Sequence, residues 1–486
     1  MKLEQLIGGY QGLFSQIPQD VSIKDICYDS RKVRPGSLFV CITGFVTDGH
    51  RYAQEAIQKG AAALVCERHL QAEVPVLLVD DSRKALAYLA DKFYDHPSGK
   101  LKLIGITGTN GKTTVTYLVK RILEDAGYCV GLIGTNQNMI GGKTLPAART
   151  TPESLELQEL FYQMVQQKVD YVVMEVSSHS LELSRVAYCD IDIGAFTNLT
   201  RDHLDFHHDM EHYFRAKAKL FDLCKTGVVN LDDDAGIRIL EHCKCVPVSY
   251  GVDNAADIYA YDMEFDSDHS TFTANILGKE TRIRLNTPGK FSVYNGLCAI
   301  GICTVCGVSS DFIARGLAEM QGVCGRAEVL PLGKPYTVMI DYAHTPDGLE
   351  NIIKSVRGFA KGRVVTLFGC GGDRDRSKRH VMGKIAGELS DFCVITSDNP
   401  RSENPEAIIR EIETGILETK CNYIVIVNRK DAIGYVLKHA QKDDVIILAG
   451  KGHETYQVVA DGTIHFDERE VVADWLDMLG ESYETN

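Results

Sequence analysis

Short apolar runs alternate with one-sided amphipathic segments along most of this chain, which is the pattern of an α/β protein. The clearest example begins at residue 101, where an apolar, β-prone run up to Ile106 predicts a buried strand. After Lys112 the period changes, and apolar side chains recur on one helical face: Val115, Leu118, Val119, Ile122, Leu123 and Ala126. Gly127 is suited to the end of that helix. We therefore predict a strand, a loop and a helix in succession.

The loop between this strand and this helix has the features of a phosphate cradle. Its glycines let backbone amides approach a bulky anion: Gly105, Gly108 and Gly111. Lys112 adds a positive charge, and the hydroxyl of Thr113 can bind Mg²⁺. The common pattern has glycine where this chain has Ile106, so we predict a P-loop variant that is shorter on its N-terminal side. An ordinary glycine turn is disfavoured, because the Gly-Lys-Thr core and the change of period coincide.

Residues 1–98 form a first α/β segment that ends at His96-Pro97-Ser98-Gly99, a predicted linker. We predict strands over 38–42, 62–66 and 76–79, and helices over 52–59 and 83–94. Polar turns at 29–31 and 42–49 carry side chains that could hold a nucleotide or a sugar, although surface turns have the same composition.

Residues 99–328 form a second segment with polar groups at two strand ends. Glu175 follows a predicted strand over 171–174, where a carboxylate can reach a metal bound to ATP; a solvated strand-end Glu is the alternative. His203 follows a predicted strand over 191–196 and is a metal ligand or, more commonly for such a position, a loop histidine.

Three further elements are predicted in this segment. Thr151 is expected to cap a helix whose first residue is Pro152, with Glu153 in its first turn. Residues 257–286 alternate polar and apolar side chains, which predicts a small antiparallel insertion, and helices resume near 292 and 310.

Residues 329–486 form a third segment, after a linker at 331–335. Strands are predicted over 337–340, 363–368, 392–396 and 445–448, and charged residues and glycines follow each of them. Open α/β sheets bind ligands at the carboxyl ends of their strands. Four such loops on one edge therefore predict a ligand-binding face that is largely cationic.

Composition narrows the functional classes. With 486 residues, 44% hydrophobic and 24% charged, the chain has the size and content of about three soluble domains. A net charge of −14 argues against nucleic acid as the main partner. We see neither an N-terminal targeting segment nor an apolar run of membrane length, so we expect a cytoplasmic protein without membrane insertion. Cys303 and Cys306 have CxxC spacing inside a predicted core helix with no second pair, which disfavours a metal site.

Taken together, the motifs resemble the Mur ligases of peptidoglycan synthesis, and they occur in that family's order. They are GTNGKTT (108–114), MEVSSH (174–179), TNLTRDHLDFH (197–207), YNGLCA (294–299), GR (325–326), DYAHTPD (341–347) and DNPR (398–401). The resemblance implies an α/β fold of three domains: an N-terminal UDP-sugar-binding domain (1–98), a central P-loop ATPase domain with a parallel sheet (99–328) and a C-terminal Rossmann-like domain that binds an amino acid (329–486). ATP and the UDP-sugar would then lie across different domains, so domain closure is expected to assemble the site.

Within the family, the resemblance is to the ligases that add the third residue of the peptide. It implies ATP-dependent amide formation, through an acyl phosphate, between UDP-MurNAc-L-Ala-D-Glu and meso-diaminopimelate, with ATP and Mg²⁺ required. The implied partners are these small molecules, and we expect a monomer. Cations rather than a protein nucleophile would bring a carboxylate and a triphosphate together.

The resemblance also implies roles for individual residues. Those expected to contact ATP are Gly108, Thr109, Asn110, Gly111, Lys112, Thr113, Thr114, Asn295, Arg326, Asp341 and His344. Those expected at the metal ions are Thr113, Glu175, His203 and Lys217, and the catalytic set is Lys112, Glu175, His203 and Lys217. Lys217, rather than Lys219, matches the family's His-Tyr-x-x-Ala-Lys pattern, whose lysine is carbamylated.

Two substrate pockets follow from the same resemblance. The UDP-sugar-dipeptide pocket is expected to include Ser30, Phe45, Val46, Thr47, Thr150, Thr151, Ser177 and Arg185. Arg149 stands before Thr150 where relatives often have Asn, so this chain departs from the family there. The diaminopimelate pocket is expected to include Arg374, Asp398, Asn399, Pro400, Arg401, Gly450 and Glu454.

Two other hypotheses remain beside the diaminopimelate-adding ligase. The first is the same chemistry with another acceptor, either L-lysine or the glutamate of folylpolyglutamate synthesis; the DNPR motif and the N-terminal domain speak against the folate version. The second is a nucleotide-dependent regulator without chemistry. Retention of Glu175, His203 and Lys217 together argues against it, because a mere ATP binder needs no second metal.

Overall fold

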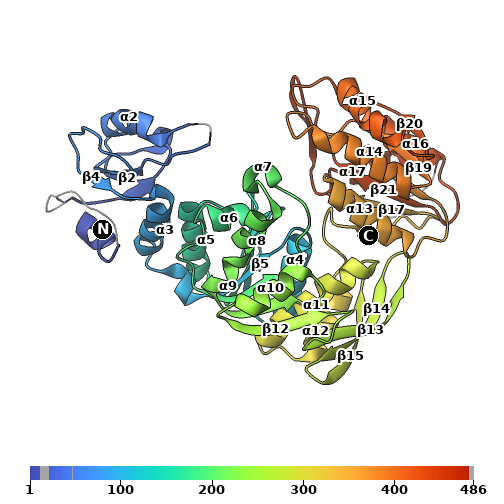
Figure 1. Ribbon diagram of the computed structural model, residues 1–486, viewed down its shortest axis with the longest axis horizontal. Coiled ribbons are helices and arrows are strands. Elements are labelled where there is room, and N and C mark those ends of the chain that lie inside the picture. The colour runs from blue at the N-terminus through green and yellow to red at the C-terminus, as the bar shows by residue number, and fades with distance from the viewer. Residues whose placement is uncertain (11–20, 46, 481–486) are drawn as a thin grey trace.

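The computed structural model describes residues 1–10, 21–45 and 47–480. Over these ranges the chain forms three successive α/β units, each built around a sheet of its own. In Figure 1 the N-terminal unit, in blue, and the C-terminal unit, in orange and red, lie on opposite sides of the green and yellow central unit. This arrangement confirms the predicted three-part α/β class, while the boundaries at 98 and 328 stay predictions. In the described part of the chain, the helices are too short or too polar to cross a membrane.

The N-terminal unit has a parallel sheet in the order β1-β2-β3-β4. The predicted strands appear as β2, β3 and β4, and the predicted helices as α2 and α3. Apolar side chains of α1 and α3 pack on one face of this sheet. The elements are α1 (Leu3–Ile7), β1 (Asp25–Cys27), η1 (Ser30–Lys32), β2 (Ser37–Val40), η2 (Gly49–Tyr52), α2 (Ala53–Gln58), β3 (Ala63–Cys66), β4 (Val76–Leu78), α3 (Ser82–Phe93) and η3 (Pro97–Lys100).

The central unit surrounds a long sheet in the order β15-β14-β13-β12-β11-β10-β5-β9-β6-β7-β8. Its strands are β5 (Lys102–Thr107), β6 (Val130–Ile133), β7 (Asn138–Ile140), β8 (Lys143–Leu145), β9 (Tyr171–Glu175), β10 (Ile191–Phe196), β11 (Cys224–Asn230), β12 (Val246–Gly251), β13 (Ile258–Phe265), β14 (Ser270–Ile276) and β15 (Lys279–Leu285). Its helices are α4 (Lys112–Asp125), α5 (Ser154–Gln166), α6 (Ser178–Glu182), α7 (Leu204–His207), α8 (Met210–Ala218), α9 (Leu220–Leu223), α10 (Asp234–His242), α11 (Lys290–Val305) and α12 (Ser310–Glu319).

Strand β5 lies between the parallel strands β10 and β9, so the predicted P-loop leaves the middle of the sheet. Antiparallel pairing of β13, β14 and β15 is as predicted for 257–286. These strands are not a separate insertion, however, because β13 pairs in parallel with β12 at Tyr250 and Ile258. The meander therefore extends the central sheet.

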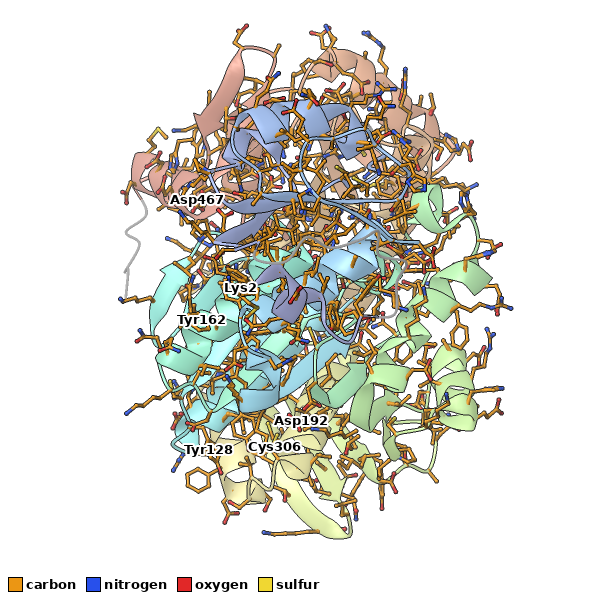
Figure 2. The ribbon with its side chains drawn as sticks, turned by 90° about the vertical axis from the view of Figure 1, so that its left-hand side faces the viewer. Lys2, Tyr128, Tyr162, Asp192, Cys306 and Asp467 are labelled. Carbon is orange, nitrogen blue, oxygen red and sulfur yellow. The ribbon has the colours of Figure 1, made fainter. Side chains whose placement is uncertain are left out.

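Helix α4 follows the P-loop as predicted, and its apolar side chains share a core with α11 and α12. The chain leaves α4 at Asp125, and Gly127 adopts a φ of +94° just beyond the end. Most of α11 is buried, including Cys303. Cys306 lies at the side of the central unit near Asp192 (Figure 2).

The predicted start of α5 is wrong. The helix begins at Ser154, and the carboxylate of Glu153 caps it by accepting a hydrogen bond from the Ser154 amide at 3.2 Å. The hydroxyl of Thr151 faces the end of β9 instead of the helix: it donates to the carbonyl of Glu175 at 2.9 Å and accepts a hydrogen bond from the Ser177 amide at 3.0 Å. The threonine is held by a neighbouring strand end, an interaction between distant residues that local sequence does not reveal.

The C-terminal unit has a sheet in the order β16-β17-β21-β18-β19-β20, with a hairpin of β22 and β23 beside it. Its elements are β16 (Glu328–Val329), β17 (Thr337–Asp341), α13 (Pro346–Arg357), β18 (Val364–Phe368), α14 (Ser377–Leu389), β19 (Phe392–Ile395), α15 (Pro405–Ile416), β20 (Asn422–Val425), α16 (Arg429–Lys438), β21 (Val445–Ala449), β22 (Tyr456–Val459), β23 (Gly462–His465) and α17 (Glu468–Met478). The four predicted strands are β17, β18, β19 and β21. They are parallel neighbours, which confirms that the loops after them share one edge.

Candidate active site

The P-loop joins β5 to α4 in a conformation that depends on glycine. Gly108 and Gly111 have φ values of +146° and +87°, which side chains rarely tolerate. A Cβ at Gly108 would lie 1.8 Å from the hydroxyl of Thr197, and one at Gly111 would lie 2.3 Å from Oδ1 of Asn295. The loop therefore packs directly against the end of β10 and against α11, which brings the predicted ATP residue Asn295 beside it.

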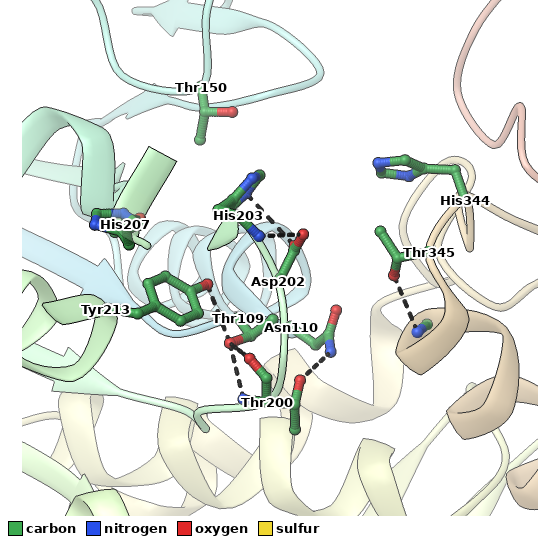
Figure 3. Close-up of polar contacts among 12 residues, drawn as sticks. Thr109, Asn110, Thr150, Thr200, Asp202, His203, His207, Tyr213, His344 and Thr345 are labelled. Carbon is green, nitrogen blue, oxygen red and sulfur yellow. Dashed lines mark hydrogen bonds and ion pairs between the residues drawn. The ribbon is translucent and has the colours of Figure 1, made fainter. Parts of the chain in front are cut away.

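The segment after β10 wraps around the P-loop (Figure 3). Asn198 accepts hydrogen bonds from the amides of Thr109 and Asn110, each at 2.9 Å. The amide of Thr200 donates to the hydroxyl of Thr109 at 3.0 Å, and that hydroxyl also pairs with Tyr213 at 3.2 Å. Sequence reasoning did not assign Asn198 and Thr200 as site residues, although both stand in the TNLT motif.

Two lysines converge on one backbone carbonyl. Nζ of Lys112 donates to the carbonyls of Gly108 at 2.9 Å and Thr109 at 2.8 Å, and Nζ of Lys217 donates to the same Gly108 carbonyl at 2.7 Å. No carboxylate among the described residues forms an ion pair with either lysine. Burial and the nearby Lys112 lower the pKa of Lys217 far below its ordinary value, and burial also lowers the pKa of Lys112. Two lysine amino groups therefore share one carbonyl without a carboxylate partner, an arrangement that an incoming anion would stabilise.

Oxygen donors gather next to these lysines. The hydroxyl of Thr113 lies 3.0 Å from both carboxylate oxygens of Glu175, which is 1% exposed at the end of β9. Thr135 holds the same carboxylate through its amide at 2.8 Å and its hydroxyl at 3.0 Å. Its hydroxyl also lies 3.0 Å from that of Thr150. Sequence reasoning missed Thr135, whose position just after strand β6 was the available signal.

His203 lies at the entrance of the site rather than in its interior. Its side chain is 47% exposed, its backbone φ is +53°, and Nε2 lies 3.5 Å from Asp202. Its ring meets that of His179 edge-on at 4.9 Å. Desolvation and the ammonium groups of Lys112 and Lys217 lower the pKa of His203, although Asp202 opposes them. A neutral imidazole is the form that can bind a metal.

The described residues predicted to bind the UDP-sugar dipeptide come from two units. The Ser177 amide donates to the hydroxyl of Thr151 at 3.0 Å, and Arg185 donates to the carbonyl of Thr151 at 3.1 Å. Ser30 is buried in the N-terminal unit. Phe45 is 76% exposed and lies 5.6 Å, centroid to centroid, from Phe206 of the central unit. The other predicted residues there are Thr47, whose hydroxyl lies 3.3 Å from that of Tyr52, and Val46, which is outside the described residues.

Residues predicted to reach ATP from the C-terminal side lie around the start of that unit. The guanidinium of Arg326 sits over the ring of Tyr342 at 4.9 Å, and Asp341 accepts a hydrogen bond from the Ala327 amide at 2.7 Å. Arg326 is close enough to Lys112 to lower its pKa. In Figure 3 the ring of His344 points toward Asp202 and His203. The structure thus brings Arg326 and His344 to the phosphate side of the P-loop.

The residues predicted to bind the acceptor lie together at the carboxyl edge of the C-terminal sheet. Arg401 adopts a φ of +53°, and its guanidinium donates to the carbonyl of Gly372 at 2.7 Å. The side-chain NH₂ group of Asn399 donates to Oε2 of Glu454 at 2.9 Å. A Cβ at Gly450 would lie 2.5 Å from Oδ2 of Asp398. Two further members are Arg374 and Pro400. Arg374 is exposed, and its guanidinium donates to the carbonyl of its neighbour Asp373 at 3.1 Å. The carbonyl of Pro400 would lie 1.9 Å from a Cβ at Gly372.

This acceptor cluster is joined to the nucleotide side of its own unit, because the Gly450 amide donates to the carbonyl of Asp341 at 3.0 Å. Within the described ranges, no hydrogen bond or ion pair connects the cluster to the P-loop, Glu175 or Lys217, which belong to the central unit in Figure 1. That ATP and the UDP-sugar lie across different domains, and that domain closure assembles the site, therefore stays a prediction.

The donor set around Glu175 fits a metal bound to a nucleotide. In the part of the chain that is described, no three His, Cys, Asp or Glu side chains are arranged to hold a metal ion by themselves. Mg²⁺ in phosphoryl-transfer sites needs only one or two protein oxygens, because phosphates and waters supply the rest. The Thr113 hydroxyl and the Glu175 carboxylate are such oxygens. Together with the P-loop and two lysines that pair with no described carboxylate, they fit a nucleotide-dependent site for phosphoryl transfer.

Comparison with known proteins identifies the family. Family models match three successive parts of the chain: "Mur ligase family, catalytic domain" at 22–94, "Mur ligase middle domain" at 106–303 and "Mur ligase, glutamate ligase domain" at 325–452. This protein belongs to the Mur ligase family.

Similar curated proteins cover nearly the whole chain. A UDP-N-acetylmuramoyl-L-alanyl-D-glutamate–2,6-diaminopimelate ligase of Caldanaerobacter subterraneus is 50% identical over 479 residues, covering 98% of this chain and 99% of that protein. One from Clostridium acetobutylicum is 48% identical over 484 residues, covering 99% and 100%. A solved structure of a ligase with the same name has a TM-score of 0.72 at 28% identity and covers 99% of this chain and 100% of that chain.

The position of the Glu175 carboxylate can be tested through Gly134, a neighbour that has no side chain of its own. A Cβ at Gly134 would lie 2.5 Å from Oε1 of Glu175, so we expect Gly134→Ala to displace this carboxylate and lower turnover by about 10-fold or more while the protein stays folded. Gly99→Ala is the matched control, because its Cβ would meet only Asp190 at an ordinary 3.8 Å. Steady-state rates and melting temperatures of both variants test this, and full activity of Gly134→Ala would contradict it.

Proposed function

We propose that this Mur ligase uses ATP to join meso-diaminopimelate to the D-glutamate carboxylate of UDP-MurNAc-L-Ala-D-Glu, releasing ADP and phosphate. The observation that carries the proposal is the convergence of Lys112 and Lys217 on the Gly108 carbonyl beside Glu175. The printed names of relatives about half identical over the full chain support the choice of substrates.

The chemistry explains why such a site needs cations. A carboxylate is a poor acyl donor, so its conversion to an acyl phosphate makes phosphate the leaving group when the amine attacks. Two anions, the carboxylate and the γ-phosphate, must approach each other for that first step. Lys112 and the P-loop amides would hold the phosphates, and Thr113 and Glu175 would hold Mg²⁺, which when bound would offset phosphate charge. His203 would serve at a second Mg²⁺.

Lys217 is proposed to act as a carbamate. Its amine would add to CO₂, forming an N–C bond and releasing one proton, which converts a cation into an anionic oxygen donor. Only the neutral amine can react, and burial favours this form by lowering the pKa of Lys217. Its side chain is 2% exposed and lies 4.4 Å above the ring of Tyr213, so the side chain is held in one place.

Replacement of Lys217 distinguishes a carbamate from a simple cation. We expect Lys217→Ala to lose about 100-fold or more in turnover, as when a preorganised charged group is removed. Added formate or acetate should restore part of the rate by supplying an oxygen donor. Lys217→Arg keeps the charge and should remain inactive. Phosphate release with and without formate is the measurement, and full activity of Lys217→Arg would refute the carbamate.

The acceptor pocket supports diaminopimelate over L-lysine. Diaminopimelate carries a second carboxylate at its far end, and the guanidinium of Arg401 can bind a carboxylate through two parallel hydrogen bonds. This guanidinium is partly buried, and the carbonyl of Gly372 holds it in place. With L-lysine bound, this guanidinium would face an ammonium group and would have no carboxylate to bind. Arg374, Asp398 and Gly450 would complete the pocket.

An acceptor screen tests the proposal directly. With UDP-MurNAc-L-Ala-D-Glu and ATP present, we expect meso-diaminopimelate to exceed L-lysine in catalytic efficiency by about two to four powers of ten, because an unmatched buried partner costs roughly 3–5 kcal/mol. Arg401→Ala should reduce this difference in catalytic efficiency, because it weakens the binding of diaminopimelate. Equal use of both amino acids by the wild type would exclude the proposed acceptor.

Omitting one substrate at a time separates this proposal from the other hypotheses. ADP formation that needs both the UDP-dipeptide and an amino acid supports the ligase, whereas ADP formation without them, or none at all, supports a regulator. The cytoplasmic location, the monomeric state and the domain boundaries at 98 and 328 remain part of the proposal.

A further inference from the structure

A buried lysine lies inside the acceptor pocket, and none of the roles assigned above involves it. Lys451 follows β21, and its side chain has no exposed surface. The loop path forces it inward, because the flanking glycines have positive φ values, +116° at Gly450 and +55° at Gly452. A Cβ at Gly452 would lie 2.7 Å from Cβ of Tyr342, so this side of the loop is tightly packed. A fully buried lysine is rare unless it is paired.

Lys451 is paired with two residues proposed to bind the acceptor. Its ammonium donates to Oε2 of Glu454 at 3.0 Å and to Oδ1 of Asn399 at 3.2 Å. The Val458 amide also donates to Oδ1 of Asn399, at 2.9 Å. A lysine can only donate, so this oxygen must face it, and the Asn399 NH₂ group is thereby turned toward Glu454. The Lys451 ammonium and the Val458 amide thus orient Asn399 together, and the same ammonium holds Glu454.

The same contacts leave one carboxylate oxygen of Glu454 available to a ligand. Asn399 and Lys451 both donate to Oε2, and no described residue donates to Oε1. The side chain of Glu454 is 12% exposed. A carboxylate held by one oxygen, with the other unused, is preorganised to accept a hydrogen bond from an ammonium group of the acceptor.

The buried ion pair behind Lys451 is formed by two other residues, and Lys451 acts on it only as a nearby charge. Arg429 and Glu468 are fully buried and bond to each other at 2.8 Å, and Arg429 also donates to the carbonyl of Ala449 at 2.8 Å. The ammonium of Lys451 instead lies near aromatic rings, 5.7 Å from the centroid of Tyr456 and 6.0 Å from that of Phe466. Its hydrogen bonds point to the pocket.

We propose that Lys451 is a positioning residue for the acceptor amino acid: it locks Glu454 and Asn399 in the orientation that recognises the amino and carboxylate groups of diaminopimelate. This inference rests on the proposed function, since it assumes that the amino acid binds at this edge of the sheet. Lys451 acts through its two neighbours and touches no reacting atom.

The test is a comparison of Michaelis constants for the three substrates in Lys451→Met. Loss of a charge-assisted contact in a buried pocket should raise the KM for diaminopimelate by about 10- to 100-fold. The kcat at saturating diaminopimelate should stay within about 3-fold of wild type, and the KM values for ATP and the UDP-dipeptide should not change. Lys451→Gln keeps a hydrogen-bond donor and should give a smaller rise in the KM for diaminopimelate. This variant preserves the test if Lys451→Met does not fold.

Controls separate this inference from the proposed function. Lys430→Met removes a lysine that is 45% exposed and pairs with Asp474 at 3.0 Å, and all three KM values should stay at the wild-type level. An unchanged diaminopimelate KM in folded Lys451→Met and Lys451→Gln, or an equal rise in all three KM values, would overturn the role of Lys451. A wild type that does not use diaminopimelate would instead overturn the proposed function.

Discussion

The active-site region depends on the crowding of two lysine amino groups around the carbonyl of Gly108. Lys112 and Lys217 bond to it at 2.9 and 2.7 Å, and no carboxylate of the described residues neutralises them. Like charges repel strongly away from water, so this arrangement favours an incoming anion, or a change of charge at one of the lysines. It exists because β5 runs through the middle of the sheet, so that its loop is flanked by the ends of β9 and β10. Those two ends supply Glu175 and the segment that wraps the loop.

A second constraint links the nucleotide side of the C-terminal unit to the acceptor side. The loop after β21 contributes Glu454 and Lys451 to the acceptor pocket. The same loop packs against the Gly325 turn, where a Cβ would lie 2.1 Å from the His453 amide, and the ring of His453 lies 4.9 Å from that of Tyr342. Arg326 follows that turn and covers Tyr342. Movement of this unit toward the central unit would therefore carry both groups together, which is the behaviour expected of a site completed by closure.

Local sequence patterns predicted those elements and site residues that depend only on neighbouring positions in the chain. The change of period at Lys112 located the P-loop and α4, and the strand ends located Glu175 and the four loops of the C-terminal sheet. The start predicted for α5 was wrong because the hydroxyl of Thr151 bonds to the carbonyl of Glu175, a residue 24 positions away. Thr135 and Lys451 escaped notice for a similar reason, since their importance lies in contacts with Glu175 and Asn399 that only the folded chain creates. The roles of Lys217 and Arg401 came from family resemblance and not from spacing.

The central claim is that the buried amine of Lys217 is neutral enough to take up CO₂ while Lys112 remains an ammonium group. Incubation of the purified protein with ¹³C-bicarbonate, followed by ¹³C NMR, measures this without turnover. The account predicts one carbamate signal that disappears in Lys217→Met and persists in Lys219→Met, a change at an exposed lysine that pairs with Glu182. An active enzyme without a carbamate signal, or a signal that survives Lys217→Met, would contradict it.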